Sequence, residues 1–100
     1  MPMLPDSGIK AQVQEEICQL AAQHQLHQVI LFGSRARGDY HRASDIDLAV
    51  SGGDITRFAL DVDQETSTLL HYDVVDLDQD IPTALREAIQ AEGRTLYEEI

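Results

Sequence analysis

The sequence predicts an α/β (α+β) domain in which a small mixed β-sheet is backed by helices. Helical and strand-like hydrophobic periods alternate along the chain, in the order α-β-α-β-α-β. The chain has 100 residues, 43% hydrophobic and 25% charged, which suffices for one small core. We therefore expect a single domain over residues 1–100, with residues 1–8 flexible because proline and glycine interrupt them.

The first half of the chain predicts a helix, a buried strand and a polar loop. A helix start at Asp6 or Ser7 precedes apolar residues at helical spacing, namely Ile9, Val13, Ile17, Leu20 and Ala21. The continuous apolar run over 29–32 is typical of a central strand, and Gly33 stops it. Residues 34–44 are polar and rich in arginine, which predicts a loop or a single helical turn.

The second half continues the alternation of periods. Residues 45–50 alternate strictly, which predicts a strand with Ile46, Leu48 and Val50 on one face and Asp45, Asp47 and Ala49 on the other. Asp54 can cap a helix whose apolar face consists of Ile55, Phe58, Ala59, Val62, Thr66 and Leu69. The remaining expected elements are a strand over 72–77, a helix between Pro82 and Gly93, and an edge strand over 95–97.

The charge balance excludes several classes of partner. The chain carries 18 Asp and Glu against 7 Lys and Arg, a formal net charge of −11. Neutralising phosphates needs clustered basic residues, so direct nucleic-acid binding and docking on an anionic membrane are not expected. The single Cys18 cannot form an internal disulfide, and no apolar run reaches the ~18 residues of a spanning helix. The expected compartment is the cytoplasm.

Two carboxylates stand in an otherwise apolar predicted strand. Asp45 and Asp47 are two positions apart, so they point to the same side, ~6–7 Å apart along the strand. Carboxylates on one face repel each other unless a cation lies between them. Mg²⁺ is the natural cation, because one or two carboxylates hold it while substrate phosphates complete its coordination. The same pair would also fit the solvated face of an edge strand.

The residues upstream favour the metal site over the solvated face. Gly33 and Ser34 follow the buried strand, and ten residues separate Ser34 from Asp45, which makes the pattern Gly-Ser-x10-Asp-x-Asp. Glycine lets the backbone pass close to a ligand, and the turn opened by Ser34 can cradle an anion with N–H groups and a hydroxyl. Three of the seven basic residues lie in the loop between, namely Arg35, Arg37 and Arg42. They either steer phosphates or pair with surface acids such as Asp39.

This segment resembles the DNA polymerase β-type nucleotidyltransferase superfamily, whose signature is the same Gly-Ser, spacer and Asp-x-Asp. It is most similar to the minimal nucleotidyltransferases of bacteria and archaea, and the resemblance covers essentially the whole chain. The resemblance implies a nucleotidyltransferase fold with a third carboxylate on a neighbouring strand, in a Val-Asp-Leu-Val-like context. The run Tyr72-Asp73-Val74-Val75 matches that context, which makes Asp73 the candidate. Asp76 is the competitor, because the period of two alone cannot choose between them.

The resemblance also implies an enzyme that moves AMP from ATP onto a hydroxyl. Asp45 and Asp47 would hold two Mg²⁺ ions ~3.5–4 Å apart, with Asp73 completing the acceptor-side metal site. Gly33 and Ser34 would position the phosphates, assisted by Arg35 or Arg37. Stand-alone relatives typically act as antitoxins that adenylylate a tyrosine of a small HEPN-type ribonuclease toxin, so a HEPN-type partner in a hetero-oligomer is expected. An acidic surface would suit a basic partner.

Two other classes of function compete with this reading. One is a binding module that neutralises its partner by complex formation alone. The intact glycine, serine and aspartate pair speak against it, because a degenerate site tends to lose a costly like-charged pair. The other is a calcium loop, which Asp76, Asp78, Asp80 and Glu87 imitate by their spacing. Ile81 stands where such a loop needs glycine, which disfavours this reading.

Overall fold

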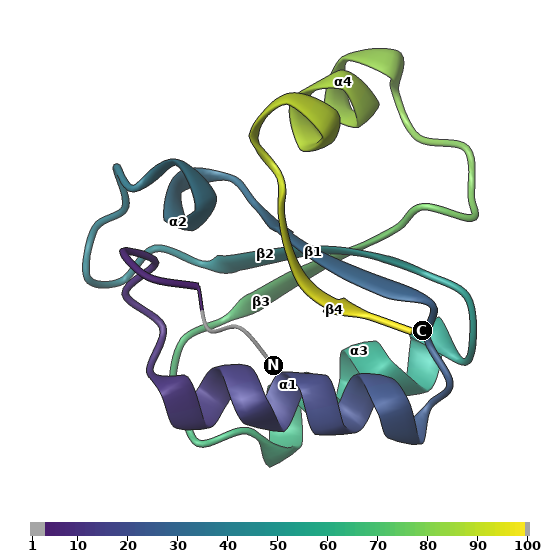
Figure 1. Ribbon diagram of the computed structural model, residues 1–100, viewed down its shortest axis with the longest axis horizontal. Helices are drawn as coiled ribbons and strands as arrows, with labels where there is room; N and C mark the ends of the chain where they lie inside the picture. Colours follow the sequence, from purple (N-terminus) through teal and green to yellow (C-terminus); the bar gives the residue numbers. More distant parts are fainter. Residues whose placement is uncertain (1–3, 100) are drawn as a thin grey trace.

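The computed structural model describes residues 4–99 and contains a four-stranded sheet with the order β3-β2-β1-β4 (Figure 1). The strands are β1 (Gln28–Phe32), β2 (Ile46–Ser51), β3 (Tyr72–Asp76) and β4 (Arg94–Glu98). β1 pairs antiparallel with both β2 and β4, whereas β2 and β3 are parallel. The sheet is therefore mixed and flanked by helices, and the predicted fold class is confirmed.

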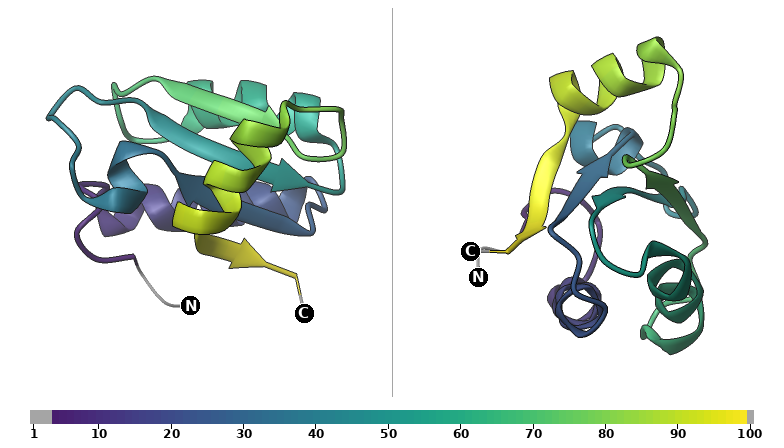
Figure 2. Two further views of the ribbon diagram at one scale, coloured as in Figure 1. Left: turned by 90° about the horizontal axis from the view of Figure 1, so that it is seen from above. Right: turned by 90° about the vertical axis from the view of Figure 1, so that its right-hand side faces the viewer.

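Helices cover both faces of this sheet. α1 (Ala11–Gln23) and α3 (Ile55–Glu65) lie below it in Figure 1, and α4 (Thr83–Glu92) lies above it. The end view in Figure 2 shows the same layers, with α1 and α3 side by side. The single-turn helix α2 (Ser34–Arg37) follows β1, as the polar loop predicted. None of the helices within residues 4–99 combines the length and the apolar character needed to cross a bilayer.

The main hydrophobic core lies between the sheet and the pair α1 and α3. Leu48 and Val50 of β2 are fully buried there, together with Phe58 of α3. A smaller apolar cluster, built on Phe32, Ala49 and Ile89, lies between the sheet and α4. Residues of β2 thus alternate between the two faces, as the strict alternation in the sequence predicted.

The N-terminal segment departs from the expectation. α1 begins at Ala11 with Lys10 as its N-cap, so a helix start at Asp6 or Ser7 is wrong. The reason is that Asp6 and Gly8 have positive φ, at 60° and 71°, which a right-handed helix cannot accommodate. Residues 4–8 make contacts with the rest of the chain: Leu4 N donates to Gln14 Oε1 at 2.8 Å, and the carbonyl of buried Ser7 accepts from Arg35 Nη1 at 2.9 Å. The expected flexibility of residues 1–3 lies outside the described residues.

The two ends of α3 show one confirmed and one wrong prediction. Asp54 caps the helix as predicted, since its Oδ1 accepts from the N–H of Arg57 at 3.1 Å. Leu69, however, is not on the helix face but fully exposed, because α3 already ends at Glu65. The Glu16 carboxylate accepts from both the N–H and the hydroxyl of Ser67, each at 2.7 Å, and draws the chain toward α1.

The later elements follow their predictions with small shifts in their ends. β3 ends at Asp76, one residue before the predicted end, and β2 begins at Ile46, so Asp45 immediately precedes the strand. α4 lies between Pro82 and Gly93, as expected. β4 is an edge strand beside β1.

Candidate active site

Three aspartates meet at one end of the sheet, on the face covered by α4. The parallel register of β2 and β3 pairs Asp47 with Asp73, so the two side chains point to the same side. Both side chains lie on the same face of the sheet as Ala49, whereas Leu48 and Val50 point into the core on the opposite face. Asp45 stands two positions before Asp47, and its charge acts on the Asp47 carboxyl. The structure therefore brings together the three carboxylates that the sequence singled out.

The competing aspartate lies on the other face of the sheet. Asp76 pairs with Val50 in the β2–β3 register, and Val50 belongs to the core under α1 and α3. Its Oδ1 accepts a hydrogen bond from the N–H of Asp78 at 2.8 Å, which fixes the turn after β3. The register thus distinguishes Asp73 from Asp76, where the sequence period alone left both open.

The carboxylate cluster carries a large unfavourable charge interaction. Burial, and after it the negative charges of Asp73 and Asp45, together raise the pKa of Asp47 to about 6, although Arg37 acts to lower it. Asp45 and Asp73 themselves are exposed. Within residues 4–99, no Lys, Arg or His forms an ion pair with any of the three. A bound cation at this position would relieve the repulsion.

The donor set suits a hard divalent cation that also contacts substrate. Carboxylate oxygens are the ligands that Mg²⁺ prefers, and proteins usually hold Mg²⁺ by one or two carboxylates plus substrate phosphates. No three His, Cys, Asp or Glu side chains in the described part of the chain form a preformed metal site. Any ion held by the aspartates would need further ligands, such as substrate phosphate oxygens, to complete its coordination.

Gly33 is the point at which the backbone passes closest to the carboxylates. Its φ of 75° lies in the region that favours glycine, and a Cβ at this position would collide with Asp47 Oδ2. The register explains this contact, because Phe32 pairs with Asp47 across β1 and β2. Ser34 follows as the first residue of α2, whose turn closes when Arg37 N donates to the Gly33 carbonyl at 3.0 Å. Gly33 and Ser34 are thus both placed beside the aspartate cluster.

Arg35 does not reach the aspartates, although the sequence made it a candidate phosphate ligand. Its side chain is almost fully buried, with 1% of the residue exposed. The guanidinium donates to the carbonyls of Ser7 at 2.9 Å, Ser44 at 3.0 Å and Arg42 at 3.2 Å, and it stacks on Tyr40 with its centre 4.8 Å from the ring centroid. Arg35 therefore ties the loop before β2 to the N-terminal segment, and its donors are occupied by backbone.

Arg37 is the arginine that the structure brings to the site. It is exposed, and its Nη1 lies 3.1 Å from both carboxylate oxygens of Glu92, while its Nε lies 3.3 Å from Asp39 Oδ2. Glu92 also accepts from the N–H of Gly33 at 3.3 Å. Sequence reasoning missed Glu92, because 59 positions separate it from Gly33 and no local pattern connects them.

Comparison with known protein families shows to which family the chain belongs. The family model described as polymerase beta, nucleotidyltransferase, matches residues 15–99. The chain belongs to this family. A protein of Methanocaldococcus jannaschii to which protein adenylyltransferase activity is ascribed is 37% identical over 81 residues, which cover 72% of this chain and 79% of the relative.

Solved structures share the nucleotidyltransferase fold of this chain. A toxin–antitoxin structure containing AMP-PNP matches with a TM-score of 0.71 and 28% identity, covering 86% of this chain and 73% of the other. A variant of the toxin–antitoxin MntA-HpeT, with two aspartates separated by one residue changed to glutamate, gives 0.69 and 26% over the same shares. A structure assigned as a minimal nucleotidyltransferase gives 0.63 and 29%, covering 81% and 86%.

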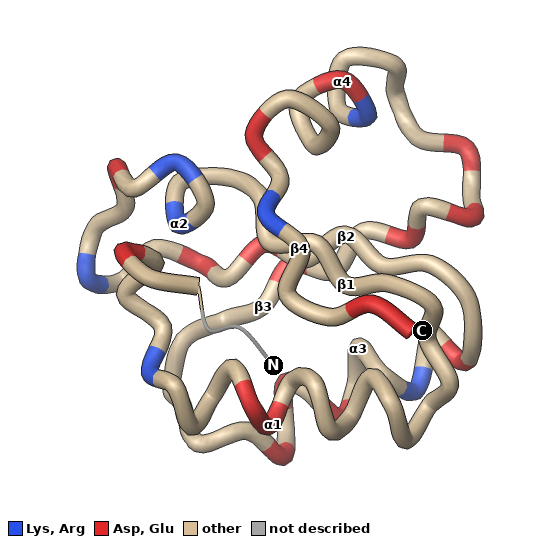
Figure 3. Tube along the Cα trace, in the orientation of Figure 1, with Lys and Arg blue, Asp and Glu red and all other residues tan. Residues whose placement is uncertain are grey.

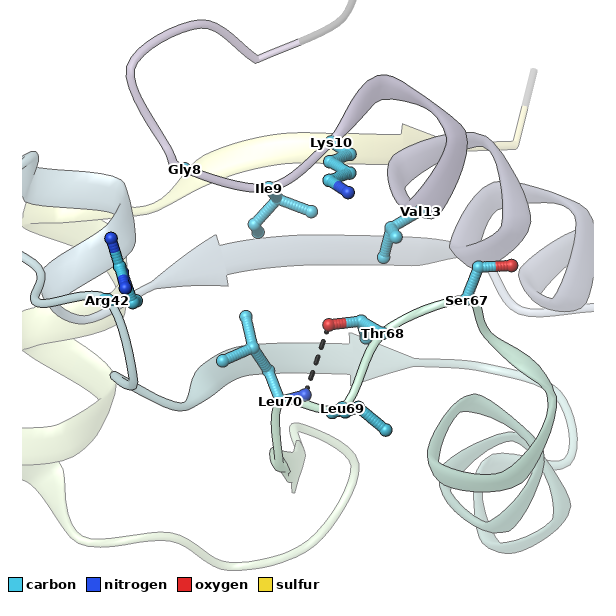
Figure 4. A pocket seen from close by; sticks show the side chains of 9 residues that line it. All are labelled: Gly8, Ile9, Lys10, Val13, Arg42, Ser67, Thr68, Leu69 and Leu70. Atoms are coloured by element: carbon cyan, nitrogen blue, oxygen red, sulfur yellow. Dashed lines mark hydrogen bonds between the residues drawn. The ribbon is translucent and has the colours of Figure 1, made fainter.

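A pocket on the opposite face of the sheet is separate from the aspartate cluster. It has a volume of about 420 Å³ and lies between segment 8–13 and loop 67–70. Ile9 and Leu70 point toward one another from its two sides, and Arg42 lies at one end (Figure 4). None of the three aspartates lines it. The three arginines of the predicted loop thus have three different surroundings, and of the three it is the charge of Arg37 that acts on the aspartate cluster.

Proposed function

We propose that the chain is a Mg²⁺-dependent adenylyltransferase that moves AMP from ATP onto a tyrosine of a HEPN-type ribonuclease toxin and so acts as its antitoxin. The observation that carries the proposal is the convergence of Asp45, Asp47 and Asp73 beside Gly33. Carboxylates that share one face are the arrangement from which a two-metal phosphoryl-transfer site is built. The choice of a protein as acceptor is based on the names of similar proteins, which include a protein adenylyltransferase and a toxin–antitoxin.

Each residue of the site has a separate task in this reaction. Asp45 and Asp47 would hold two metal ions, and Asp73 would complete the acceptor-side ion site. Gly33, Ser34 and Arg37 bind the phosphates through N–H, hydroxyl and guanidinium donors. When bound, Mg²⁺ supplies neutralisation of the leaving pyrophosphate and a lowered pKa of the acceptor hydroxyl. The acceptor oxygen forms a bond to the α-phosphorus, the bond between the α-phosphorus and the bridging oxygen of the leaving pyrophosphate breaks, and the hydroxyl proton passes to water beside the exposed Asp73.

The position of Asp73 favours a macromolecular acceptor. Asp73 is exposed and lies on β3, an edge strand of the sheet. An acceptor can therefore approach the metal site from outside the domain without entering a closed pocket. Similar structures are toxin–antitoxin complexes, one of them containing AMP-PNP and another a tyrosine-to-alanine variant. The relative from M. jannaschii carries a name that specifies transfer to protein.

The surface charge favours a basic protein over a nucleic acid as the acceptor. The net charge is −11, and acidic positions are spread over α1, α3, α4 and the loop leading to α4 (Figure 3). Phosphate backbones would be repelled by such a surface, whereas the basic RNA-binding face of a ribonuclease would be attracted.

The test measures AMP transfer to the partner. The HEPN-type protein that co-purifies with the chain is incubated with ATP and Mg²⁺, and its mass is measured before and after. We expect a gain of one or more AMP units on a tyrosine, lost in Asp47→Asn. Asp76→Asn is the matched control, because it removes the same charge from the same sheet on the opposite face and keeps an oxygen for Asp78 N. Neutralisation of the toxin by Asp47→Asn at full strength, without a mass gain, would instead show a binding module.

A further inference from the structure

Glu92 occupies the donors that the proposed function gives to the nucleotide phosphates. It is the last residue of α4, and its side chain is 23% exposed. One carboxylate oxygen lies 3.3 Å from the backbone nitrogen of Gly33, and both oxygens lie 3.1 Å from Arg37 Nη1. These two donors come from the turn after β1 and from α2, and the carboxylate of Glu92 bridges them.

The chemistry of this contact is that of a bound phosphate. A carboxylate oxygen and a phosphate oxygen accept the same charge-assisted hydrogen bonds, from a backbone N–H on one side and a guanidinium on the other. Glu92 also adds its negative charge to the aspartate cluster, since it is among the charges that raise the pKa of Asp47. A triphosphate that approaches the site therefore finds its donors engaged and meets an additional like charge.

The backbone beneath Glu92 is packed against the sheet, whereas its side chain is partly exposed and can turn toward solvent. Ile89 of the same helix is 3% exposed against the sheet, and Gly93 N donates to the Ile89 carbonyl at 2.8 Å. A Cβ at Gly93 would collide with that carbonyl and approach Ile30, so the chain turns tightly into β4 directly after Glu92. Rotation about the side-chain bonds of Glu92 suffices to release Gly33 and Arg37, without movement of α4.

We propose that Glu92 is an internal occupant of the phosphate site, which the nucleoside triphosphate displaces when it binds. Glu92 then sets the affinity for nucleotide, because every phosphate ligand must compete with it for Gly33 and Arg37. The inference rests on the proposed roles of Gly33 and Arg37 in phosphate binding. It assigns to Glu92 a role in ligand entry and none in the transfer step.

The test measures nucleotide binding in the absence of an acceptor. The Kd of an ATP analogue with a methylene bridge between the α- and β-phosphates is measured with Mg²⁺ for the full chain and for Glu92→Gln. Glutamine keeps the size of the side chain and removes its charge, so we expect Kd to fall about fivefold, the worth of one like-charge contact at ~4 Å in water. Glu92→Ala, which also frees the donors, should lower Kd further. Glu87→Gln on the exposed side of α4 is the control and should leave Kd within about twofold.

A second readout follows the contact itself. The amide resonance of Gly33 should move when the analogue binds to the full chain, and in Glu92→Ala it should already differ in the free protein. A Kd that is unchanged or higher in Glu92→Gln, with clear binding by the unsubstituted chain, overturns this inference alone. A higher Kd would mean that Glu92 orients Arg37 for the phosphate. Absence of binding in all variants would overturn the proposed function together with it.

Discussion

The two faces of the β-sheet divide stability and chemistry between them. Under α1 and α3, fully buried residues such as Leu48 and Phe58 form the large core. Under α4, a small apolar cluster adjoins three carboxylates with no ion-pair partner among residues 4–99. The difference shows that one face supplies the stability that offsets the repulsion on the other. Adjacent residues of β2 belong to opposite faces, so single substitutions can separate the two contributions.

Substitution of two neighbouring residues on β2 should reveal the largest difference between the two faces. Leu48→Ala should lower the free energy of unfolding by about 2–5 kcal/mol, because it leaves a cavity in a fully packed site. Asp47→Asn should raise the free energy of unfolding, because it removes a partly desolvated charge beside two others, and it should abolish AMP transfer. Urea denaturation measures the first effect and the transfer assay the second. Comparable destabilisation by both substitutions would contradict the division between the faces.

The two arginines of α2 should differ in the same way, because one affects stability and the other affects activity. Arg35→Met should lower the free energy of unfolding by about 3 kcal/mol, because it leaves buried carbonyls without donors. Arg37→Met should change the free energy of unfolding by less than about 0.5 kcal/mol, since the Arg37 side chain is about half exposed and water screens its ion pairs. Its effect should instead appear as a higher KM for ATP. Thermal unfolding and initial-rate kinetics measure the stability and the KM for ATP of both variants. An Arg35→Met protein as stable as the unsubstituted chain would refute the structural role of Arg35.

Gly33 and Gly38 offer a sharper contrast with smaller effects. Both have positive φ, at 75° and 93°, so alanine should cost about 1 kcal/mol at either position from backbone strain. A Cβ at Gly33 would also collide with Asp47, whereas nothing lies within 4 Å of a Cβ at Gly38. Gly33→Ala should therefore lose transfer activity while Gly38→Ala retains it. Equal activity of the two variants would show that the close approach at Gly33 is not needed for the reaction.

Local sequence patterns predicted the elements, whereas long-range contacts decided their surroundings. The period of two placed Asp45 and Asp47 on one side, and Asp54 marked the start of α3. The choice of Asp73 over Asp76 needed the strand register, which depends on how β3 pairs with β2. The end of α3 also depended on a distant residue, because the apolar period continues to Leu69 while Glu16 captures Ser67.

The arginines show most clearly what the sequence alone does not determine. Arg35 and Arg37 stand two positions apart in the same polar stretch, and both are equally plausible phosphate ligands by their chemistry. Arg35 is buried because the N-terminal segment brings the Ser7 carbonyl to it across 28 positions. Glu92 reaches Arg37 across 55 positions. Partners so far apart in the sequence leave no periodic signal. The sequence could therefore suggest both arginines as phosphate ligands but could not show which of them lies near the aspartates.

The pH dependence of stability tests the charged face directly. The pKa of Asp47 is raised from its ordinary value of 3.8 to about 6, chiefly by burial and then by Asp73 and Asp45. Between these two values the folded protein holds a proton on Asp47 that the unfolded chain has lost. The contribution of this group to the free energy of unfolding therefore decreases as pH rises from about 4 to about 6, and stays low above that range.

Thermal unfolding in EDTA should show this decrease in the unsubstituted chain, and Asp47→Asn should lack it, because asparagine does not titrate. Mg²⁺ added at pH 7 should raise Tm of the unsubstituted chain more than that of Asp47→Asn. A cation beside the aspartates offsets the negative charge that Asp47 carries at this pH. Leu48→Ala is the control, because it lowers Tm at every pH without changing the difference made by Mg²⁺. An equal Mg²⁺ effect on Tm in Asp47→Asn would mean that Asp47 does not contribute to a cation site, and the assignment of this face to metal-dependent chemistry would then rest on Asp45 and Asp73 alone.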